Sequence, residues 1–436
     1  MGINSDTIYA LATPIGVSGV AIIRISGPEA HWILSQLVAD ELVSKLRPRA
    51  ATIHRLYDPQ SGELIDEGLI LWFPAPASFT GEDVIELQVH GSRAVIDKLS
   101  DVLANLGCRP ANAGEFSRRS LDNGKLDLIS VEALDGLIHA NDPATLALAH
   151  GQAGKARQKI FDGWRSTLTR LLASCEALID FPEDDLPPEL IDENKLELES
   201  IRQAVAKLAE RSELAQSLHQ GLEILLAGPP NSGKSTLLNA LAGYERAIVS
   251  EEPGTTRDFV ELEMSMGRFH VRFVDTAGLR ETQISVENKG IQRTRERFTT
   301  ASLILNLHEP NQTIEEIEAT CPVWNVQTKG VVQSVRSIAA GESKYPGVDD
   351  LLKEIQDWLD HTYGHVLESL SFHRERQVFH VKQILEFLDQ ARQDEPFPEL
   401  QAEHLRQAAQ ALGFLSGAIH VEDVLDELFR GFCIGK

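Results

Sequence analysis

Residues 228–235, Gly-Pro-Pro-Asn-Ser-Gly-Lys-Ser, constrain the fold of this chain more than any other segment, because they match the pattern Gly-x-x-x-x-Gly-Lys-Ser/Thr. The apolar run 222–227 precedes the motif and the helix-like run 236–241 follows it. In such a loop the backbone N–H groups and the helix N-terminus face phosphate groups, and the lysine, here Lys234, reaches the terminal phosphates. The segment therefore predicts a nucleotide-binding α/β domain in which Ser235 binds Mg²⁺.

Two later segments supply the other groups that such a site uses. The strand-like run 269–274 leads into Asp275-Thr276-Ala277-Gly278, so we expect Asp275 to hold the Mg²⁺ shell and the Gly278 N–H to sense a γ-phosphate. Between the motifs lies the polar loop 254–258, whose Thr256 hydroxyl is expected to complete the metal shell. The order and spacing predict hydrolysis of a nucleoside triphosphate by water, coupled to loop ordering.

The chain changes character on either side of this α/β segment. Residues 1–120 mix strand-like runs at 20–25 and 84–89 with glycine and proline breakers and a helical pattern at 92–106, which predicts an α+β module. Helical patterns, including a long stretch at 145–179, occupy both sides of the α/β segment, which is therefore predicted to be inserted into one helical domain. The fold class is multidomain, α/β and α+β, and the predicted boundaries are 1–120, 121–219, 220–360 and 361–436.

Charge and cysteine content exclude several classes of protein. The chain has 41 Lys and Arg against 65 Asp and Glu, a net charge of −24, so a uniformly basic nucleic-acid-coating surface is excluded and any RNA contact must be local. The four cysteines lie far apart, without zinc-finger or Cys-x-x-Cys spacing, which disfavours a structural zinc or a disulfide framework. No charged leader and no run of about 18 apolar residues is present, so we expect a cytoplasmic protein without membrane association.

Segments at both ends of the chain resemble the MnmE (TrmE) family of tRNA-modification GTPases. The last residues, Phe-Cys-Ile-Gly-Lys at 432–436, match the Cys-x-Gly-Lys ending of that family. The other similar segments are 6–27, 78–87, 114–117 and 125–128, beside the nucleotide motifs 228–235, 254–258 and 275–278. The resemblance implies an N-terminal tetrahydrofolate-binding domain that also forms a homodimer, a helical domain, and an inserted GTPase domain with a doubly wound sheet.

The same resemblance implies an activity and partners. Family members hydrolyse GTP and act with an FAD-dependent partner, MnmG, in a heterotetramer that adds an aminomethyl or carboxymethylaminomethyl group at carbon 5 of the wobble uridine of certain tRNAs. The implied cofactors are GTP, Mg²⁺, K⁺ and 5-formyl- or methylene-tetrahydrofolate. One alternative is a regulatory GTPase switch that binds ribosomes or RNA without modification chemistry, and another is a folate-binding structural subunit. The folate motifs at the termini favour the modification enzyme, because a pure switch does not need them.

The resemblance also assigns roles to individual residues. Folate contacts fall on Arg24, Glu86, Lys125 and Lys436, which suit a pterin that pairs with a carboxylate and a glutamate tail that attracts cations. Glu287 is expected to orient the hydrolytic water and Cys433 to be the essential C-terminal cysteine. The expected K⁺ ligands are Asn231, Ser250, Glu252 and Thr255, and the expected Mg²⁺ ligands are Ser235 and Thr256. The expected GTP-binding residues are Asn231, Ser232, Gly233, Lys234, Ser235, Thr236, Ser250, Glu251, Glu252, Pro253, Gly254, Thr255, Thr256, Asp275, Thr276, Ala277 and Gly278.

One segment departs from the pattern of this kind of GTPase. Guanine is usually read by Asn-Lys-x-Asp, but residues 322–331 contain no such motif. If Asn325 is aligned with the first position, the fourth is Thr328; if Thr328-Lys329 is aligned with Asn-Lys, the fourth is Val331. Losing a carboxylate that pairs with two donors removes on the order of 10²-fold of guanine discrimination. We therefore expect the domain to bind GTP weakly, through the phosphate loop and Lys329. Equal affinities for GTP and ATP would contradict this expectation.

Overall fold

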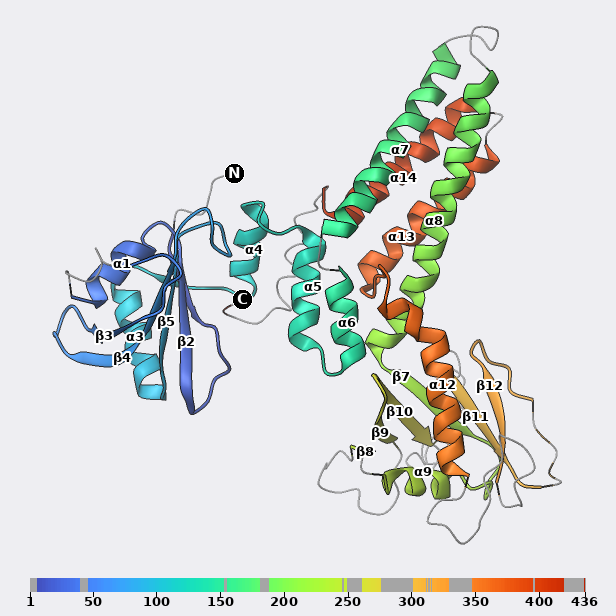
Figure 1. Ribbon diagram of the computed structural model, residues 1–436, viewed down its shortest axis with the longest axis horizontal. Helices are drawn as coiled ribbons and strands as arrows, with labels where there is room; N and C mark the ends of the chain where they lie inside the picture. Colours follow the sequence, from blue (N-terminus) through green and yellow to red (C-terminus); the bar gives the residue numbers. More distant parts are fainter. Residues whose placement is uncertain are drawn as a thin grey trace, which may run out of the picture. The chain divides into compact units, whose positions relative to one another are not determined.

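The computed structural model describes residues 6–39, 46–152, 155–180, 188–244, 247–248, 261–275, 301–310, 312, 314, 316–328, 347–394, 397–418 and 435. Contacts divide the chain into two compact units (Figure 1). The first unit comprises Met1–Asp135 together with Ser416–Lys436, and the second comprises Gly136–Leu415. None of the described helices is long and apolar enough to cross a lipid bilayer.

The first unit is built on a six-stranded sheet in the order β3-β4-β5-β2-β1-β6. Alternation along β2 turns Ile23 and Ile25 into the core, where they join Leu34 and Leu99 of two helices that cover that face, and it leaves Arg24 on the other face. Neighbouring strands are antiparallel, except that β1 and β6 are parallel. The strands are β1 (Ile8–Leu11), β2 (Ser18–Ser26), β3 (Thr52–Tyr57), β4 (Leu64–Phe73), β5 (Val84–Gly91) and β6 (Arg109–Pro110), and the helices are α1 (Ala30–Leu37), α3 (Arg93–Asn105) and α4 (Glu115–Asp122).

This unit confirms the α+β prediction at the level of individual elements. The strand-like runs 20–25 and 84–89 lie within β2 and β5, which are hydrogen-bonded neighbours. The helix expected at 92–106 is α3, which begins after Ser92 because the serine hydroxyl accepts a hydrogen bond from the Val95 N–H. Leu99 and Leu103 then face the sheet.

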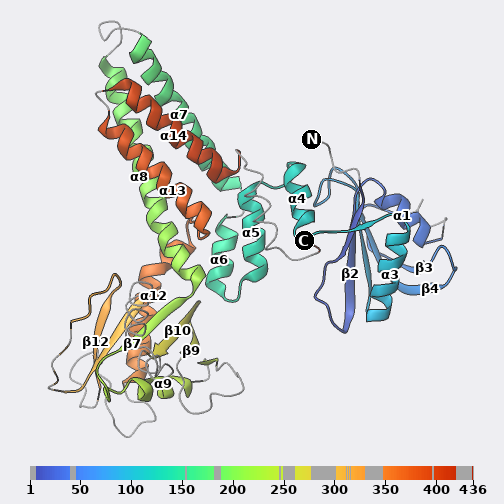
Figure 2. The ribbon, with the colours of Figure 1, turned by 180° about the vertical axis from the view of Figure 1, so that it is seen from behind.

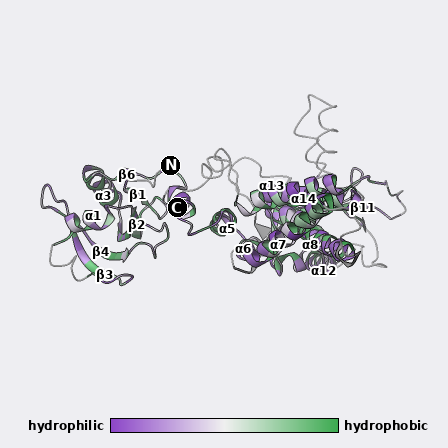
Figure 3. Ribbon diagram, turned by 90° about the horizontal axis from the view of Figure 1, so that it is seen from above, coloured by the Kyte–Doolittle hydropathy of each residue, from purple (hydrophilic) through white to green (hydrophobic). Residues whose placement is uncertain are grey.

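Long helices from both sides of the α/β segment pack together in the second unit. Helix α8 contacts α7, α12 and α13, and α7, α8, α13 and α14 run side by side in both views of the ribbon (Figures 1 and 2). Each of these helices carries hydrophilic and hydrophobic residues along its length (Figure 3), as expected for helices that bury one stripe. Their bounds, with those of α5 and α6, are α5 (Leu128–His139), α6 (Pro143–Gln152), α7 (Lys155–Asp180), α8 (Pro188–Gln220), α12 (Val348–Leu367), α13 (Glu375–Gln393) and α14 (Pro398–Ser416).

A second six-stranded sheet, in the order β12-β11-β7-β10-β9-β8, forms the α/β part of this unit. Strand β7 is central and parallel to both β10 and β11, and β11 is parallel to β12. Ligands of such sheets bind beyond the carboxyl ends of the parallel strands, where the strand order reverses. The elements are β7 (Leu222–Ala227), α9 (Lys234–Ala242), β8 (Ala247–Ile248), β9 (Glu261–Met266), β10 (Phe269–Asp275), β11 (Leu303–His308) and β12 (Val323–Gln327).

The predicted order of strand, loop and helix around residues 228–235 is confirmed. Every residue of β7 is buried, and α9 begins at Lys234. Leu237 and Leu241 of α9 share one hydrophobic core with Ile355 and Leu359 of α12. This core fixes the start of α9 relative to the sheet.

A buried polar cluster lies where the chain passes from α12 to α13. Gln152 Nε2 donates to the Ser371 carbonyl at 3.1 Å and to His373 Nδ1 at 2.8 Å. The His373 ring is 3% exposed and lies 4.3 Å from the His219 ring, centroid to centroid. Burial, together with the charges of His219 and Arg374, lowers the pKa of His373 to about 3, so the imidazole is neutral at physiological pH.

Candidate functional site

The loop after β7 has a backbone that requires glycine at its first position. Gly228 has φ +130°, and a Cβ there would lie 2.1 Å from the Leu307 carbonyl oxygen at the end of β11. Such a contact is far inside van der Waals range, so no other residue fits without moving a strand. Gly233, with φ +95°, turns the chain into α9. The two glycines therefore let the loop wrap tightly at the carboxyl edge of the sheet.

Lys234 folds back over this loop. Its Nζ donates to the Gly228 carbonyl at 2.9 Å and to the Pro229 carbonyl at 2.8 Å, and the side chain is buried. A buried ammonium held at the mouth of a loop of backbone N–H groups is placed to meet a phosphate. Ser232 and Gly233 lie in the loop itself, and Thr236 lies in the first turn of α9.

Ser235 and Asp275 come together although 40 residues separate them. The Ser235 hydroxyl donates to Asp275 Oδ2 at 2.9 Å, and Asp275, at the end of β10, is 2% exposed. Mg²⁺ at nucleotide sites is usually bound by one or two such protein oxygens, with phosphates and water completing the octahedron. The pair therefore fits the metal that the sequence predicts.

The structure also decides between the two alignments of the base-recognition segment. Asn325 lies inside β12 and accepts a hydrogen bond from Asn306 at 3.1 Å. Thr328 follows β12 at its carboxyl end, where its hydroxyl donates to the Ser232 carbonyl of the phosphate loop at 2.7 Å and its N–H donates to the His308 carbonyl at 2.8 Å. Nucleotides bind at this edge of the sheet. Thr328 therefore occupies the first position of the motif, and the fourth falls on Val331.

Thr328→Val is expected to weaken nucleotide binding by about 5- to 10-fold, because it removes a hydrogen bond that joins the phosphate loop to the end of β12. Asn325→Asp, which keeps the oxygen that accepts from Asn306, is the matched control and should leave affinity unchanged. Titration of a fluorescent GTP analogue measures both variants. If Asn325→Asp weakened nucleotide binding and Thr328→Val did not, Asn325 and not Thr328 would occupy the first position of the motif.

A second group of predicted residues meets in the first unit. Arg24 and Glu86 are register partners on β2 and β5, and Arg24 donates through Nη2 and Nε to Glu86 Oε1 at 2.8 and 3.0 Å. The rings of Phe79 and Phe116 lie 5.9 and 5.8 Å from the guanidinium carbon. Arg24 Nη1 also donates to the carbonyl of Gly435 at 3.4 Å. The two ends of the chain thus meet at one partly exposed ion pair.

Lys125 lies beside this group, next to the loop that carries Phe79. A Cβ added to Gly81 would lie 3.0 Å from Lys125 Cε. No direct hydrogen bond or ion pair joins Lys125 to Arg24 or Glu86 in the described part of the chain. The structure therefore brings Arg24 and Glu86 into contact and leaves Lys125 at the neighbouring loop.

Asn231 lies in the phosphate loop with φ +66°, and the remaining predicted site residues lie outside the described residues. They are Ser250, Glu251, Glu252, Pro253, Gly254, Thr255, Thr256, Thr276, Ala277, Gly278, Glu287, Cys433 and Lys436. Two kinds of residue were missed by sequence reasoning. Phe79 and Phe116 lie within segments that carried the family resemblance, but no role was predicted for either side chain. Thr328 was recognised only as a departure from a motif.

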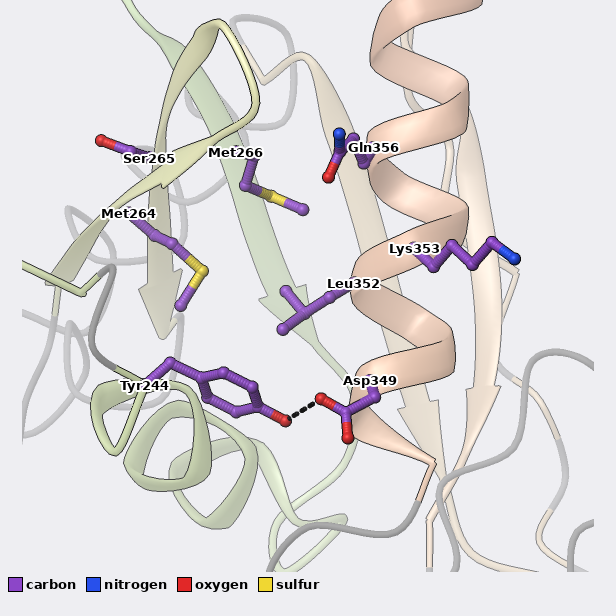
Figure 4. Close-up of a pocket in the computed structure, with 8 residues that line it drawn as sticks. All are labelled: Tyr244, Met264, Ser265, Met266, Asp349, Leu352, Lys353 and Gln356. Atoms are coloured by element: carbon purple, nitrogen blue, oxygen red, sulfur yellow. Dashed lines mark hydrogen bonds between the residues drawn. The ribbon is translucent and has the colours of Figure 1, made fainter.

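A groove of about 460 Å³ lies between β9 and α12, away from the phosphate loop (Figure 4). The Tyr244 hydroxyl donates to Asp349 Oδ1 at 2.6 Å across one end of it. Lys353 also lines the groove and belongs to α12. Since no residue of the phosphate loop lines it, the groove provides control positions on the same fold. Its lining residues are Tyr244, Met264, Ser265, Met266, Asp349, Leu352, Lys353 and Gln356.

A phosphate loop between a central parallel strand and a helix, with a serine–aspartate pair at the carboxyl edge, defines a P-loop nucleotide-binding protein. Family models described as "GTP-binding protein TrmE N-terminus" and "MnmE helical domain" match residues 7–125 and 128–433. The protein called "tRNA modification GTPase MnmE" is 41% identical to this chain in Rhizobium meliloti, covering 100% of both chains. The proteins of that name are 40% identical in Paramagnetospirillum magneticum (99% of this chain, 100% of the relative) and 38% in Brucella anthropi (99% and 98%). The chain belongs to the MnmE (TrmE) family of tRNA-modification GTPases.

Proposed function

We propose that this chain hydrolyses GTP in the modification of tRNA, adding an aminomethyl or carboxymethylaminomethyl group at carbon 5 of the wobble uridine together with an FAD-dependent partner of the MnmG type. The observation that carries the proposal is the contact of Ser235 with Asp275 beside Lys234, at the carboxyl edge of a parallel sheet. Full-length similarity to proteins named tRNA modification GTPases supplies the tRNA context. We also propose a cytoplasmic homodimer with domains at 1–120, 121–219, 220–360 and 361–436.

The nucleotide site divides the work of hydrolysis among its residues. Lys234 binds the terminal phosphates, and Ser235, with Thr256 and Asp275, holds Mg²⁺ and its water shell. Glu287 orients the attacking water. Bound Mg²⁺ neutralises charge on the phosphates, and K⁺ held by Asn231, Ser250, Glu252 and Thr255 supplies further positive charge in place of an arginine. Cys433 is proposed to take part in the modification step.

Arg24, Glu86, Lys125 and Lys436 are proposed to hold a tetrahydrofolate derivative, which supplies the one-carbon unit when bound. The Arg24 and Glu86 side chains are 22% and 16% exposed, so a ligand can reach both. The hydrogen bonds from Arg24 hold the Glu86 carboxyl group in one orientation, as a group that accepts from a pterin must be held. The chemistry of the residues therefore fits the group.

The deciding experiment is nucleoside analysis, by mass spectrometry, of tRNA from a strain that lacks this gene. We expect the C5-modified wobble uridines to disappear and to return when the wild-type gene, but not a Lys234→Ala variant, is supplied. A variant at Lys353 in the groove, Lys353→Ala, should restore them as the wild type does. An unchanged nucleoside profile in the deletion strain would instead support the regulatory-switch alternative.

A further inference from the structure

We propose that Arg119 is a positioning residue for the folate site: its buried ion network holds the loop 78–83 so that Phe79 lies against Arg24. The inference rests on the proposed folate function of Arg24 and Glu86. No hydrogen bond or ion pair joins Arg119 to either residue in the described part of the chain, so it acts through the loop and through α4.

Arg119 is a cation enclosed by three carboxylates. Its side chain is 1% exposed and projects from α4. Its Nη1 donates to the Glu82 carboxylate at 3.1 Å, and its Nη2 donates to Asp6 Oδ1 at 2.8 Å and to Glu115 Oε1 at 3.2 Å. The planar guanidinium can satisfy three acceptors at fixed angles, which the single ammonium of a lysine cannot reproduce. The network therefore fixes α4 relative to Glu82 and to the chain just before β1.

Two carboxylates of this network, Asp6 and Glu115, have lowered pKa values. Burial raises the pKa of Asp6, but a hydrogen bond from Arg109 and the charge of Arg119 lower it by more. The pKa of Asp6 therefore lies below its ordinary value. Burial also raises the pKa of Glu115, but the hydrogen bonds that its carboxylate accepts from Arg109 and from the Asn112 N–H outweigh this effect. The pKa of Glu115 is therefore lowered. Asp6 and Glu115 are therefore ionised partners of Arg119 at neutral pH.

Glu82 connects the network to the loop. Glu82 Oε2 accepts a hydrogen bond from the Ser26 hydroxyl at 2.7 Å, and Ser26 lies 2.8 Å, oxygen to oxygen, from the Thr80 hydroxyl. Ser26 and Thr80 are fully buried. The loop is thus anchored to β2 at the strand that also carries Arg24.

The end of α4 holds the same loop from its other side. The Ser120 hydroxyl donates to the Phe79 carbonyl at 2.8 Å, and Asn123 Nδ2 donates to the Thr80 carbonyl at 2.7 Å. Helix α4 also carries Phe116, the second ring near the Arg24 guanidinium. One helix, fixed by Arg119, therefore places both aromatic rings that restrict Arg24, and such preorganisation raises affinity by reducing the ordering cost of binding.

The test measures binding of 5-formyltetrahydrofolate to the full chain by calorimetry. Arg119→Lys keeps the charge but not the fork, and it is expected to weaken binding about tenfold. Arg93→Lys on the exposed face of α3 is the matched control and should bind as the wild type does. GTP hydrolysis, which depends on the second unit, should stay within about twofold in both variants, and a circular dichroism melt checks that each is folded.

A second variant covers the case in which Arg119→Lys does not fold. Asn123 is exposed, so Asn123→Ala removes only the hydrogen bond to the loop and is expected to weaken folate binding about threefold. Unchanged affinity in the folded variants would overturn the positioning role. If the wild-type chain binds no folate, the proposed folate function fails instead.

A double-mutant cycle separates positioning from a general structural effect. In an Arg24→Lys background the aromatic rings no longer have a guanidinium to restrict, so adding Arg119→Lys should reduce folate affinity by less than about twofold. A full tenfold loss in that background would show that Arg119 acts elsewhere in the domain and would overturn the inference.

Discussion

Lys234→Ala is expected to reduce GTP affinity at least about 100-fold, because it removes a charged hydrogen-bond donor from the terminal phosphates. The Lys234 ammonium donates hydrogen bonds to the Gly228 and Pro229 carbonyls of the phosphate loop. Lys353, which belongs to α12, lines the groove and not the phosphate loop. Titration of a fluorescent GTP analogue measures the loss.

Lys353→Ala is the matched control for this measurement. It removes the same charge from the same fold, at a position that does not line the phosphate loop. We expect its GTP affinity to equal that of the wild type at fixed ionic strength. Micromolar binding retained by Lys234→Ala, or equal losses in both variants, would show that the loop does not bind phosphate as assigned.

His373 is expected to make the second unit less stable in mild acid. Burial lowers the pKa of His373 from its ordinary 6.5 to about 3. Between these values the unfolded chain binds a proton that the folded chain does not, so the contribution to stability is complete above pH 6.5 and falls as the pH decreases. At up to 1.4 kcal/mol per pH unit, the loss between pH 7 and pH 4.5 is about 3 kcal/mol.

The variant His373→Asn isolates this effect from the titration of carboxylates. Asparagine keeps an acceptor for Gln152 Nε2 but does not titrate, so the stability difference between wild type and variant should shrink by about 3 kcal/mol over that pH range. Urea unfolding followed by hydrogen exchange in α8 and α13 measures it. His361→Asn, at an exposed position of α12, should track the wild type at every pH. A pH-independent difference for His373→Asn would contradict the assignment.

Local patterns predicted the elements of the nucleotide site well. The uninterrupted apolar run 222–227 and the motif 228–235 require a buried strand followed by a helix, and β7 and α9 are those elements. Both are properties of consecutive residues. The helical stretch expected at 145–179 is present as two helices, α6 and α7, and Gln152 at the end of α6 bonds to residues 371 and 373. Those partners are more than 200 positions away in the sequence, so a local hydrophobic pattern cannot predict these contacts.

In the candidate folate site, too, the contacts between distant residues could not be predicted from local sequence patterns. The identities of Arg24 and Glu86 came from a family resemblance, because two isolated charges in strands suggest only surface positions. Their contact depends on β2 and β5 pairing in one register. Arg119 carried no sequence signal as a functional residue, since its burial depends on Asp6 and Glu82 from distant segments as well as on Glu115 of its own helix. Thr328 gained a role only when its hydroxyl was seen to reach Ser232.

The contact between Arg24 and Gly435 has a consequence for biosynthesis. The two residues are 411 positions apart in the chain. At about 5–20 residues per second, a ribosome needs roughly 20–80 s to translate that interval. The N-terminal part of the first unit therefore emerges early but receives this contact only after the entire second unit has been made. A nascent chain that stalls in between carries the N-terminal sheet with Arg24 paired to Glu86 but still without its hydrogen bond to Gly435.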